Sequence, residues 1–267
     1  FLMSRIDTVF EQLRSEGRKA LMPFITAGDP DLDFTGDAIS TLASHGASLL
    51  EIGFPYSDPI ADGPVIQASY TRALEGGLQL PQIFAAARHW SDQVTTPMAA
   101  MVSYSIVYRQ GLEQFVSLAR EAGFSGMIVP DLLVEEATPL REICQREEMS
   151  LIQLVTPTTS RDRALRIAES SSGFLYYVSV TGITGERDQL PVDLTDQVGW
   201  LREQTELPIC IGFGISKPEH VEHLAPVADG VIVGSAIVRK IATVGEIPRE
   251  QVLSEIGEFA DQLGSAL

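Results

Sequence analysis

The most constraining feature of this sequence is a regular alternation between short apolar runs and longer amphipathic segments. The apolar runs are too short for helices and carry almost no charge; they cover residues 20–26, 48–53, 98–102, 126–129, 151–155, 174–178, 208–211 and 230–233. Runs that are apolar on both faces are typical of parallel strands covered on both sides. Segments with helical spacing lie between them, at residues 33–45, 81–91, 112–122, 135–147, 161–170, 194–204 and 218–224.

Eight strands that alternate with helices predict a (β/α)8 TIM barrel, an α/β fold of about 250 residues. The chain has 267 residues and no Gly/Ser-rich or Pro-rich linker, so we expect a single barrel domain over residues 1–267. Residues 5–15 predict an extra N-terminal helix, residues 63–74 a partly helical segment, and residues 249–263 a last helix. A doubly wound open sheet is the alternative. It more often has about five or six strands, and its glycine-rich fingerprint is absent after the first run.

Acidic residues outnumber basic residues by 36 to 19, which gives a formal net charge of −17. Such a chain repels phosphate backbones and has no basic stripe, so we expect no nucleic-acid partner. No window approaches about 18 uninterrupted apolar residues, which argues against a membrane span. The first residues lack the pattern of a secretory signal, and Cys144 and Cys210 are too few for a disulfide framework. We therefore expect a cytoplasmic protein.

Polar residues that directly follow apolar runs are candidate site residues, because the active site of a barrel lies at the C-terminal ends of its strands. Glu51 lies inside the second run, between Leu50 and Ile52. A buried carboxyl group without a partner stays protonated because its pKa rises, and such a group can exchange a proton near neutral pH. A salt-bridged, idle Glu51 is an equally open interpretation of the pattern.

The loop after the second run, residues 54–64, carries Asp58 and Asp62 among three prolines. Two carboxylates held rigidly beside a buried one are typical of a site that divides acid and base roles. The alternative is that they cap turns or the next helix, as Asp often does. We expect one of the two to do only that.

Glycine-rich turns follow the last two runs, at residues 212–214 and 234–235. Barrels often bind phosphate here through backbone N–H groups and the start of a short helix, because glycine lets the backbone approach the anion. Ser235 can add a hydroxyl donor. The alternative is a simple tight turn; a dinucleotide fingerprint is excluded because Lys217 stands where a third glycine is needed.

Several of these segments closely resemble the tryptophan synthase alpha subunit family. The most specific match is residues 51–67, EIGFPYSDPIADGPVIQ. The other matches follow the remaining strands, at residues 23–30 (PFITAGDP), 129–132 (VPDL), 182–185 (GITG), 212–216 (GFGIS) and 234–236 (GSA). Since the matches are spread over the whole chain, it is identified as a member of this family.

The resemblance implies a (β/α)8 barrel that cleaves indole-3-glycerol phosphate to indole and glyceraldehyde 3-phosphate, a retro-aldol reaction. It implies that Glu51 is the main acid and base, at indole C3 and at the glycerol hydroxyl. It implies that Asp62 stabilises the charge that develops at the indole N–H. We expect the apolar cage of Glu51 and the polar loop of Asp62 to separate their pKa values.

The resemblance also implies the residues that bind substrate. Phe24, Tyr176 and Ile232 line or approach the indole slot, with the Tyr176 hydroxyl near Glu51. The phosphate is held by the glycine turns, with Gly185, Gly214 and Ser235 as contacts and Gly212 and Gly234 beside them. Thr184 steadies the catalytic aspartate when the loop after the sixth strand closes.

The implied partner is the tryptophan synthase beta subunit in an alpha2beta2 heterotetramer, which receives indole directly and carries pyridoxal phosphate. No organic cofactor and no metal are expected in this chain. Two departures fall on the partner-facing surface: Leu133 replaces a proline, and the segment around Ser105 lacks the usual Asn and Pro. His220 and His223 lack a third metal ligand, so we expect both on the surface.

Three alternative functions stay open. One is a free-standing lyase of the same family that releases indole. Another is a barrel that serves mainly as a regulatory binding partner, which the presence of Glu51, Asp62 and Thr184 disfavours. The third is a different sugar-phosphate barrel enzyme, such as an isomerase, which the loop after the second run fits poorly.

Overall fold

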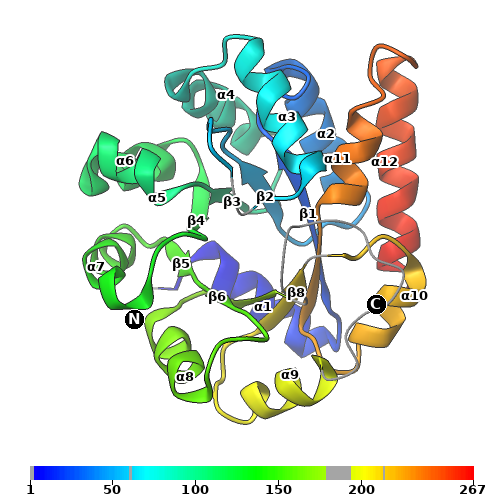
Figure 1. Ribbon diagram of the computed structural model, residues 1–267. Helices are drawn as coiled ribbons and strands as arrows, with labels where there is room; N and C mark the ends of the chain where they lie inside the picture. Colours follow the sequence, from blue (N-terminus) through cyan, green and yellow to red (C-terminus); the bar gives the residue numbers. More distant parts are fainter. Residues whose placement is uncertain (1–2, 60–61, 179–193, 213) are drawn as a thin grey trace.

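A computed structural model describes residues 3–59, 62–178, 194–212 and 214–267 (Figure 1). The strands of this part are β1 (Ala20–Thr26), β2 (Leu50–Gly53), β3 (Met98–Met101), β4 (Phe124–Ile128), β5 (Ser150–Ile152), β6 (Leu154–Val155), β7 (Leu175–Val178), β8 (Ile209–Gly212) and β9 (Gly230–Val233). Every pairing between them is parallel, in the order β5-β4-β3-β2-β1-β9-β8-β7-β6. The predicted runs thus form one curved parallel sheet.

The two edges of this sheet are the two halves of a single apolar run. Only Gln153 separates β5 from β6, and its carbonyl oxygen still accepts the N–H of Tyr176 at 3.1 Å. The Gln153 side chain is buried and donates to the carbonyl oxygen of Ser170 at 3.0 Å. Because the edges meet in one segment, the sheet nearly closes on itself, and the predicted TIM barrel is confirmed.

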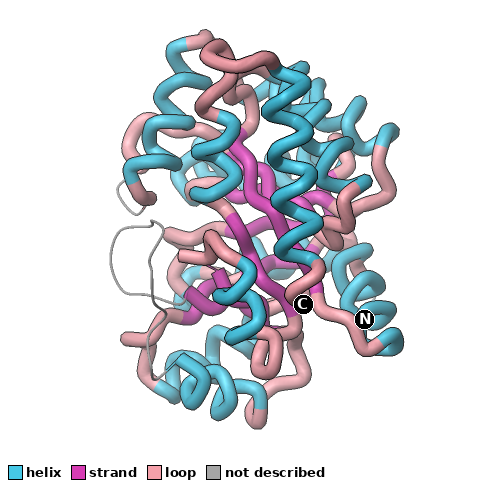
Figure 2. The backbone as a smooth tube through the Cα atoms, turned by 90° about the vertical axis from the view of Figure 1, so that its right-hand side faces the viewer, coloured by secondary structure: helices cyan, strands magenta, loops and turns pink. Residues whose placement is uncertain are grey.

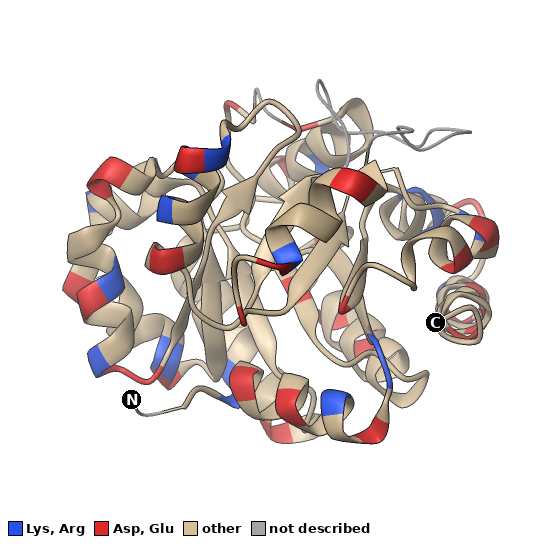
Figure 3. Cartoon of the chain, turned by 90° about the horizontal axis from the view of Figure 1, so that it is seen from below, with Lys and Arg blue, Asp and Glu red and all other residues tan. Residues whose placement is uncertain are grey.

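Helices surround the strands (Figure 2). In chain order they are α1 (Arg5–Glu16), α2 (Leu32–Ser44), α3 (Pro64–Glu75), α4 (Leu80–Gln93), α5 (Tyr104–Gln110), α6 (Leu112–Glu121), α7 (Thr138–Arg146), α8 (Arg161–Ser170), α9 (Leu194–Arg202), α10 (Pro218–Leu224), α11 (Ser235–Ile241) and α12 (Arg249–Gly264). The acidic and basic residues lie mostly on these helices and their loops, whereas the central strands are largely free of them (Figure 3).

Three helical segments differ from the sequence prediction. The helices α5 and α11 were not predicted, and the predicted helix over 135–147 is divided into a 3-10 turn, Val134–Glu136, and α7. Pro139 lies in the first turn of α7, where a missing N–H costs no hydrogen bond. The boundary therefore follows from the proline.

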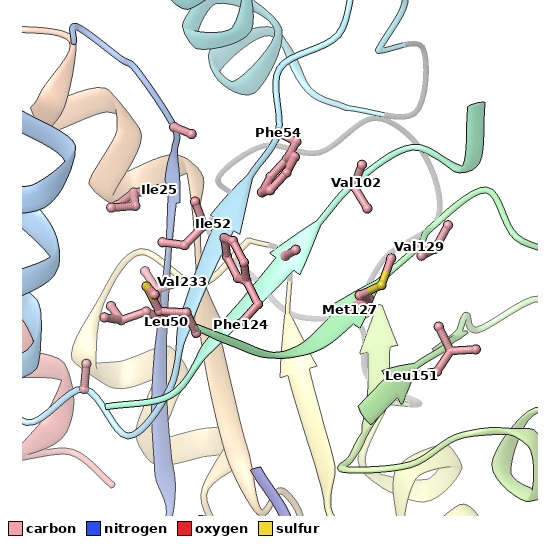
Figure 4. Close-up of a cluster of buried hydrophobic side chains, with 14 of the residues drawn as sticks. Ile25, Leu50, Ile52, Phe54, Val102, Phe124, Met127, Val129, Leu151 and Val233 are labelled. Carbon is pink, nitrogen blue, oxygen red and sulfur yellow. The ribbon is translucent and has the colours of Figure 1, made fainter. Parts of the chain in front are cut away.

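Alternate residues of each strand contribute to two separate cores. On β1 and β2, Ile25, Leu50 and Ile52 face the helices and belong to the outer core (Figure 4). Met22 and Leu49 belong to the inner core, together with Ala99, Ile128, Ile152, Tyr176, Cys210 and Ile232 from the other strands. This alternation follows from the two-residue period of a strand, which sends successive side chains to opposite faces. It places Glu51, between Leu50 and Ile52, inside the barrel.

The extra N-terminal helix is confirmed, and it covers the N-terminal end of the barrel. On α1, Ile6, Phe10 and Leu13 pack into the inner core. Polar contacts fix the helix to the starts of three strands: Ser4 Oγ lies 2.7 Å from Ser150 Oγ, Arg5 Nη2 donates to Thr95 O at 2.7 Å, and Arg14 Nη2 donates to Glu206 O at 3.2 Å. The barrel interior is therefore sealed at this end.

Candidate active site

A cleft of about 1120 Å³ opens at the C-terminal ends of the strands. Its wall includes Tyr56 and Asp62 from the β2–α3 loop, Tyr70 from α3, Asp131 from the loop after β4, and Tyr176 from β7. These residues are far apart in sequence and meet because parallel strands of a barrel end on the same face. Titratable side chains thus gather where barrel enzymes place their chemistry.

Glu51 is the most unusual side chain of the inner core. It pairs in register with Phe24 on β1 and Ala99 on β3, and its side chain is 0% exposed. Neither carboxyl oxygen has a hydrogen-bond partner among the described residues. Burial raises the pKa of Glu51 well above its usual value, because the charged form loses its hydration. Among the described residues the salt-bridged alternative therefore finds no support, and burial favours the protonated form of this carboxyl group.

Asp62 occupies a different environment in the β2–α3 loop. The Gln67 side chain folds this loop by donating from Nε2 to Asp62 O at 2.7 Å and to Pro59 O at 3.1 Å. Partial burial raises the pKa of Asp62 to about 6, and the hydrogen bond from Tyr56 opposes the rise. Both carboxyl groups therefore have raised pKa values. Glu51 is more deeply buried than Asp62, so burial favours its protonated form more strongly.

Asp58 fits the alternative given for one of the loop aspartates. It is exposed, and Ser57 Oγ donates to its Oδ2 at 2.7 Å within the turn. It does not cap α3, whose N-cap is Gly63 without a side-chain cap bond. Asp58 thus contributes to the local turn.

The predicted indole residues are buried at the inner wall: Phe24 is 4%, Tyr176 3% and Ile232 2% exposed. Glycines make room for two of them. A Cβ atom at Gly53 would lie 2.5 Å from the Phe24 ring, and one at Gly212 would lie 2.5 Å from Tyr176 Oη. Burial first, and then the charge of Glu51, raises the pKa of Tyr176, which is consistent with its hydroxyl lying near that carboxyl group.

Four of the predicted phosphate residues lie at the ends of β8 and β9, and Gly212 among them borders Tyr176 of the cleft wall. Gly214 has a φ of +81°, a conformation that favours glycine, and Ser235 is the first residue of α11, after Gly234. Gly212 is the last residue of β8. Thr184 and Gly185 fall outside the described residues.

Two further carboxylates hold the loops around the cleft and were assigned no role from the sequence. Asp131 accepts bonds from Ser103 Oγ and the N–H of Tyr104, both at 2.8 Å, and so joins the loops after β3 and β4. Asp29, at the end of β1, is 3% exposed and pairs with Arg72 on α3, at 2.8 Å from Nε and 2.7 Å from Nη2. Their position directly after an apolar run was the available signal, but the partners are distant in sequence.

Other chemistry finds little support in the described part of the chain. No group of three or more His, Cys, Asp or Glu side chains there could hold a metal ion. His220 is buried at 7% exposure, so the prediction that it lies on the surface is wrong; its ring accepts a weak bond from the Ser216 N–H. Among the described helices, none is long and apolar enough to cross a membrane. Cys144 and Cys210 are both buried and free.

The chain was compared with known families, sequences and structures. The family described as "Tryptophan synthase alpha chain" matches residues 10–266. A tryptophan synthase alpha chain of Rhodopirellula baltica is 56% identical over 99% of both chains, and one of Arabidopsis thaliana is 42% identical over 98% of this chain and 95% of the relative.

Solved structures agree. Tryptophan synthase subunit alpha of Legionella pneumophila superposes with a TM-score of 0.90 at 35% identity, covering 99% of this chain and 98% of that one. A chain from the tryptophan synthase a2b2 complex of Pyrococcus furiosus gives a TM-score of 0.84 at 36% identity, covering 91% and 97%. With a family match over nearly its whole length and close relatives over the same span, this chain belongs to the tryptophan synthase alpha chain family.

Proposed function

We propose that this protein is the alpha subunit of a tryptophan synthase and that it cleaves indole-3-glycerol phosphate to indole and glyceraldehyde 3-phosphate. The observation that carries the proposal is Glu51 on β2, a fully buried carboxyl group without a hydrogen-bond partner among the described residues, beside a cleft that Asp62 lines. The chain works as a single barrel domain over residues 1–267.

Glu51 acts first as an acid. Its raised pKa keeps a proton available at neutral pH, and transfer of this proton to indole C3 turns the ring into an electron acceptor. Glu51, now ionised, then removes the proton of the glycerol hydroxyl next to the ring. The carbon–carbon bond breaks, its electron pair returns to the ring, and the hydroxyl carbon becomes the aldehyde. The proton balance closes, because Glu51 ends as it began.

Asp62 acts on the opposite side of the ring. Protonation at C3 places positive charge on the indole nitrogen, and an ionised carboxylate that accepts the N–H bond stabilises that charge. With its pKa at about 6, Asp62 is mostly ionised at pH 7. One protonated and one ionised carboxyl group therefore coexist at neutral pH, which is the division that this reaction needs.

Phe24, Tyr176 and Ile232 form the apolar slot for the indole ring, which is supported by their burial around Glu51. The phosphate is held by backbone N–H groups of Gly185, Gly212, Gly214 and Gly234 and by Ser235, supported by the glycine turns at the ends of β8 and β9. Thr184 steadies Asp62 in the liganded enzyme.

The partner is a tryptophan synthase beta subunit, which assembles with this chain as alpha2beta2 and receives indole. The a2b2 complex of the Pyrococcus relative supports this proposal, and Leu133, a large apolar side chain 54% exposed beside the cleft loops, supports the surface. The acid–base reaction as written uses no cofactor in this chain. Pyridoxal phosphate is assigned to the partner subunit. The buried free cysteines suit a reducing cytoplasm.

The test is the rate of glyceraldehyde 3-phosphate formation from indole-3-glycerol phosphate, for the wild type with and without a beta subunit. We expect slow cleavage alone, a faster rate with the partner, and no measurable cleavage by Glu51→Gln in either case. The matched control is Glu11→Gln, which changes an exposed carboxylate on α1. Fast cleavage that ignores the partner would instead identify a free-standing lyase, and no cleavage in any sample would refute the proposal.

A further inference from the structure

Tyr56 contacts the carboxylate that the proposed mechanism uses as its charge-stabilising group. Tyr56 Oη donates a hydrogen bond to Asp62 Oδ2 at 3.5 Å, and both side chains line the cleft. Ser57 and Asp58, which directly follow Tyr56 in the same loop, are exposed. The tyrosine therefore bridges the two ends of this loop.

The Tyr56 ring is held in place by a fixed neighbour. Its centroid lies 5.6 Å from that of Tyr70 at an interplanar angle of 51°. Tyr70 is 2% exposed on α3, and its hydroxyl fits close to β2 because Gly53 has no side chain: a Cβ atom there would lie 3.0 Å from Tyr70 Oη.

Three hydrogen bonds fix α3 in turn to β1 and the loop that follows it. Thr26 Oγ1 lies 2.7 Å from Ser69 Oγ, and the Arg72 guanidinium binds Asp29 through two bonds. An aromatic ring packed on such a helix loses little further freedom when its hydroxyl binds a carboxylate. The chain of contacts from β1 through α3 thus supports the position of the Tyr56 hydroxyl.

We propose that Tyr56 is a positioning residue for the cleavage reaction, whose hydroxyl holds Asp62 in its ionised form and aims it at the indole nitrogen. This inference rests on the proposed function and adds to it a side chain outside the catalytic pair. Without the hydroxyl, Asp62 faces a less polar surrounding and holds its proton more tightly.

The groups that face Asp62 come from several elements. Tyr56 belongs to its own loop, Tyr70 to α3, Asp131 to the loop after β4, and Tyr176 to β7. Burial and the charge of Asp131 both raise the pKa of Asp62, whereas the bond from Tyr56 lowers it. Removal of that bond therefore raises the pKa above about 6, so a larger share of Asp62 is protonated and inactive near neutral pH.

The test compares Tyr56→Phe with the wild type in kcat/KM for indole-3-glycerol phosphate between pH 5.5 and 9. We expect the acidic limb of the profile to move to higher pH, with a loss of about threefold at pH 6.5 that largely disappears above pH 8. The matched control is Ser57→Ala, which removes a hydroxyl that binds Asp58 from the same loop. We expect its profile to superimpose on that of the wild type.

A second measurement does not depend on activity. The carboxyl carbon of Asp62, assigned by its loss in Asp62→Asn, is titrated by NMR in the wild type and in Tyr56→Phe, and we expect a higher midpoint in the variant. An unchanged midpoint, or an equal loss of activity at every pH, would overturn the role of Tyr56. If the wild type itself cleaves no substrate, the proposed function fails, while the NMR titration still decides whether Tyr56 controls Asp62.

Discussion

Two carboxyl groups, one following β1 and one on the neighbouring β2, are buried almost equally and yet differ in their hydrogen-bond partners. Asp29 follows β1, is 3% exposed, and is bound twice by Arg72; Glu51 lies on β2, is 0% exposed, and has no partner among the described residues. A paired buried charge fixes loops, whereas an unpaired buried acid keeps its proton and is available for chemistry. The comparison teaches that pairing, and not burial, separates the anchor from the reactive group.

The largest effect is expected from Glu51→Gln. Its activity should fall by about 10³-fold, because the amide cannot give or take the proton. Its free energy of unfolding near pH 4.5 should stay within about 1 kcal/mol of the wild type, since no bond is lost and the shape is kept, and at pH 7 it should not fall below that of the wild type, because the amide has no proton to release on unfolding. Product assays and urea unfolding measure the two quantities. A strongly destabilised Glu51→Gln would show that this carboxyl group also anchors the barrel and would break the comparison.

Asp29→Asn should give the reverse result. It leaves Arg72 without its charged partner, and we expect a loss of about 2 kcal/mol in the free energy of unfolding, less than for a fully buried pair because the Arg72 side chain is 36% exposed. The kcat of the folded variant should stay close to that of the wild type. Urea unfolding and kcat at saturating substrate test this. A variant that keeps its stability but loses its kcat would place Asp29 among the reacting groups.

The pH dependence of stability sharpens the contrast further. Glu51 has a raised pKa in the folded chain, so above about pH 4.5 the unfolded chain releases a proton that the folded chain keeps. Stability therefore falls as pH rises toward the folded pKa, by about 1.4 kcal/mol per pH unit for one such group. Urea unfolding of Glu51→Gln from pH 5 upward should lack this loss of stability up to the folded pKa of Glu51, while Glu11→Gln should keep the wild-type pH dependence.

The smallest effect is expected for an ion pair whose bonds are as short as those between Arg72 and Asp29 but whose side chains are exposed to water. Arg146 Nη2 lies 2.7 and 2.6 Å from the two oxygens of Glu113, and both side chains are more than half exposed. We expect Glu113→Gln to leave the free energy of unfolding unchanged within the error of the measurement, because water screens the pair. A loss as large as that of Asp29→Asn, measured in the same urea experiment, would mean that bond length outweighs burial.

The periodic part of the fold could be predicted from the sequence. The helices α8 and α10 coincide with the predicted ranges, because their apolar spacing and their flanks agree. The helices α5 and α11 escaped prediction; each has 7 residues, as α10 does, but lacks the proline that marks the start of α10. In α11 the run from Ser235 to Val238 also follows a strand and contains β-branched residues, which hide the change from strand to helix.

The candidate site could be predicted less evenly. The burial of Glu51 could be predicted because it lies inside an apolar run, with Leu50 and Ile52 on either side. Pairings such as Asp29 with Arg72 lie 43 residues apart, and only the folded chain brings them together. The contact of Tyr56 with Asp62 lies within one loop, yet its geometry depends on Tyr70 and Gly53, which belong to other elements.

The helix α1 determines at which end of the barrel substrate enters and product leaves. Ile6, Phe10 and Leu13 fill the N-terminal end of the barrel, so the described part of the interior opens at its C-terminal end. Substrate that reaches Glu51 and product that leaves it therefore pass the same loops, which follow the C-terminal ends of the strands. A protein bound over these loops would therefore lie in the path of both substrate entry and product release, since the described residues leave the product no exit at the N-terminal end.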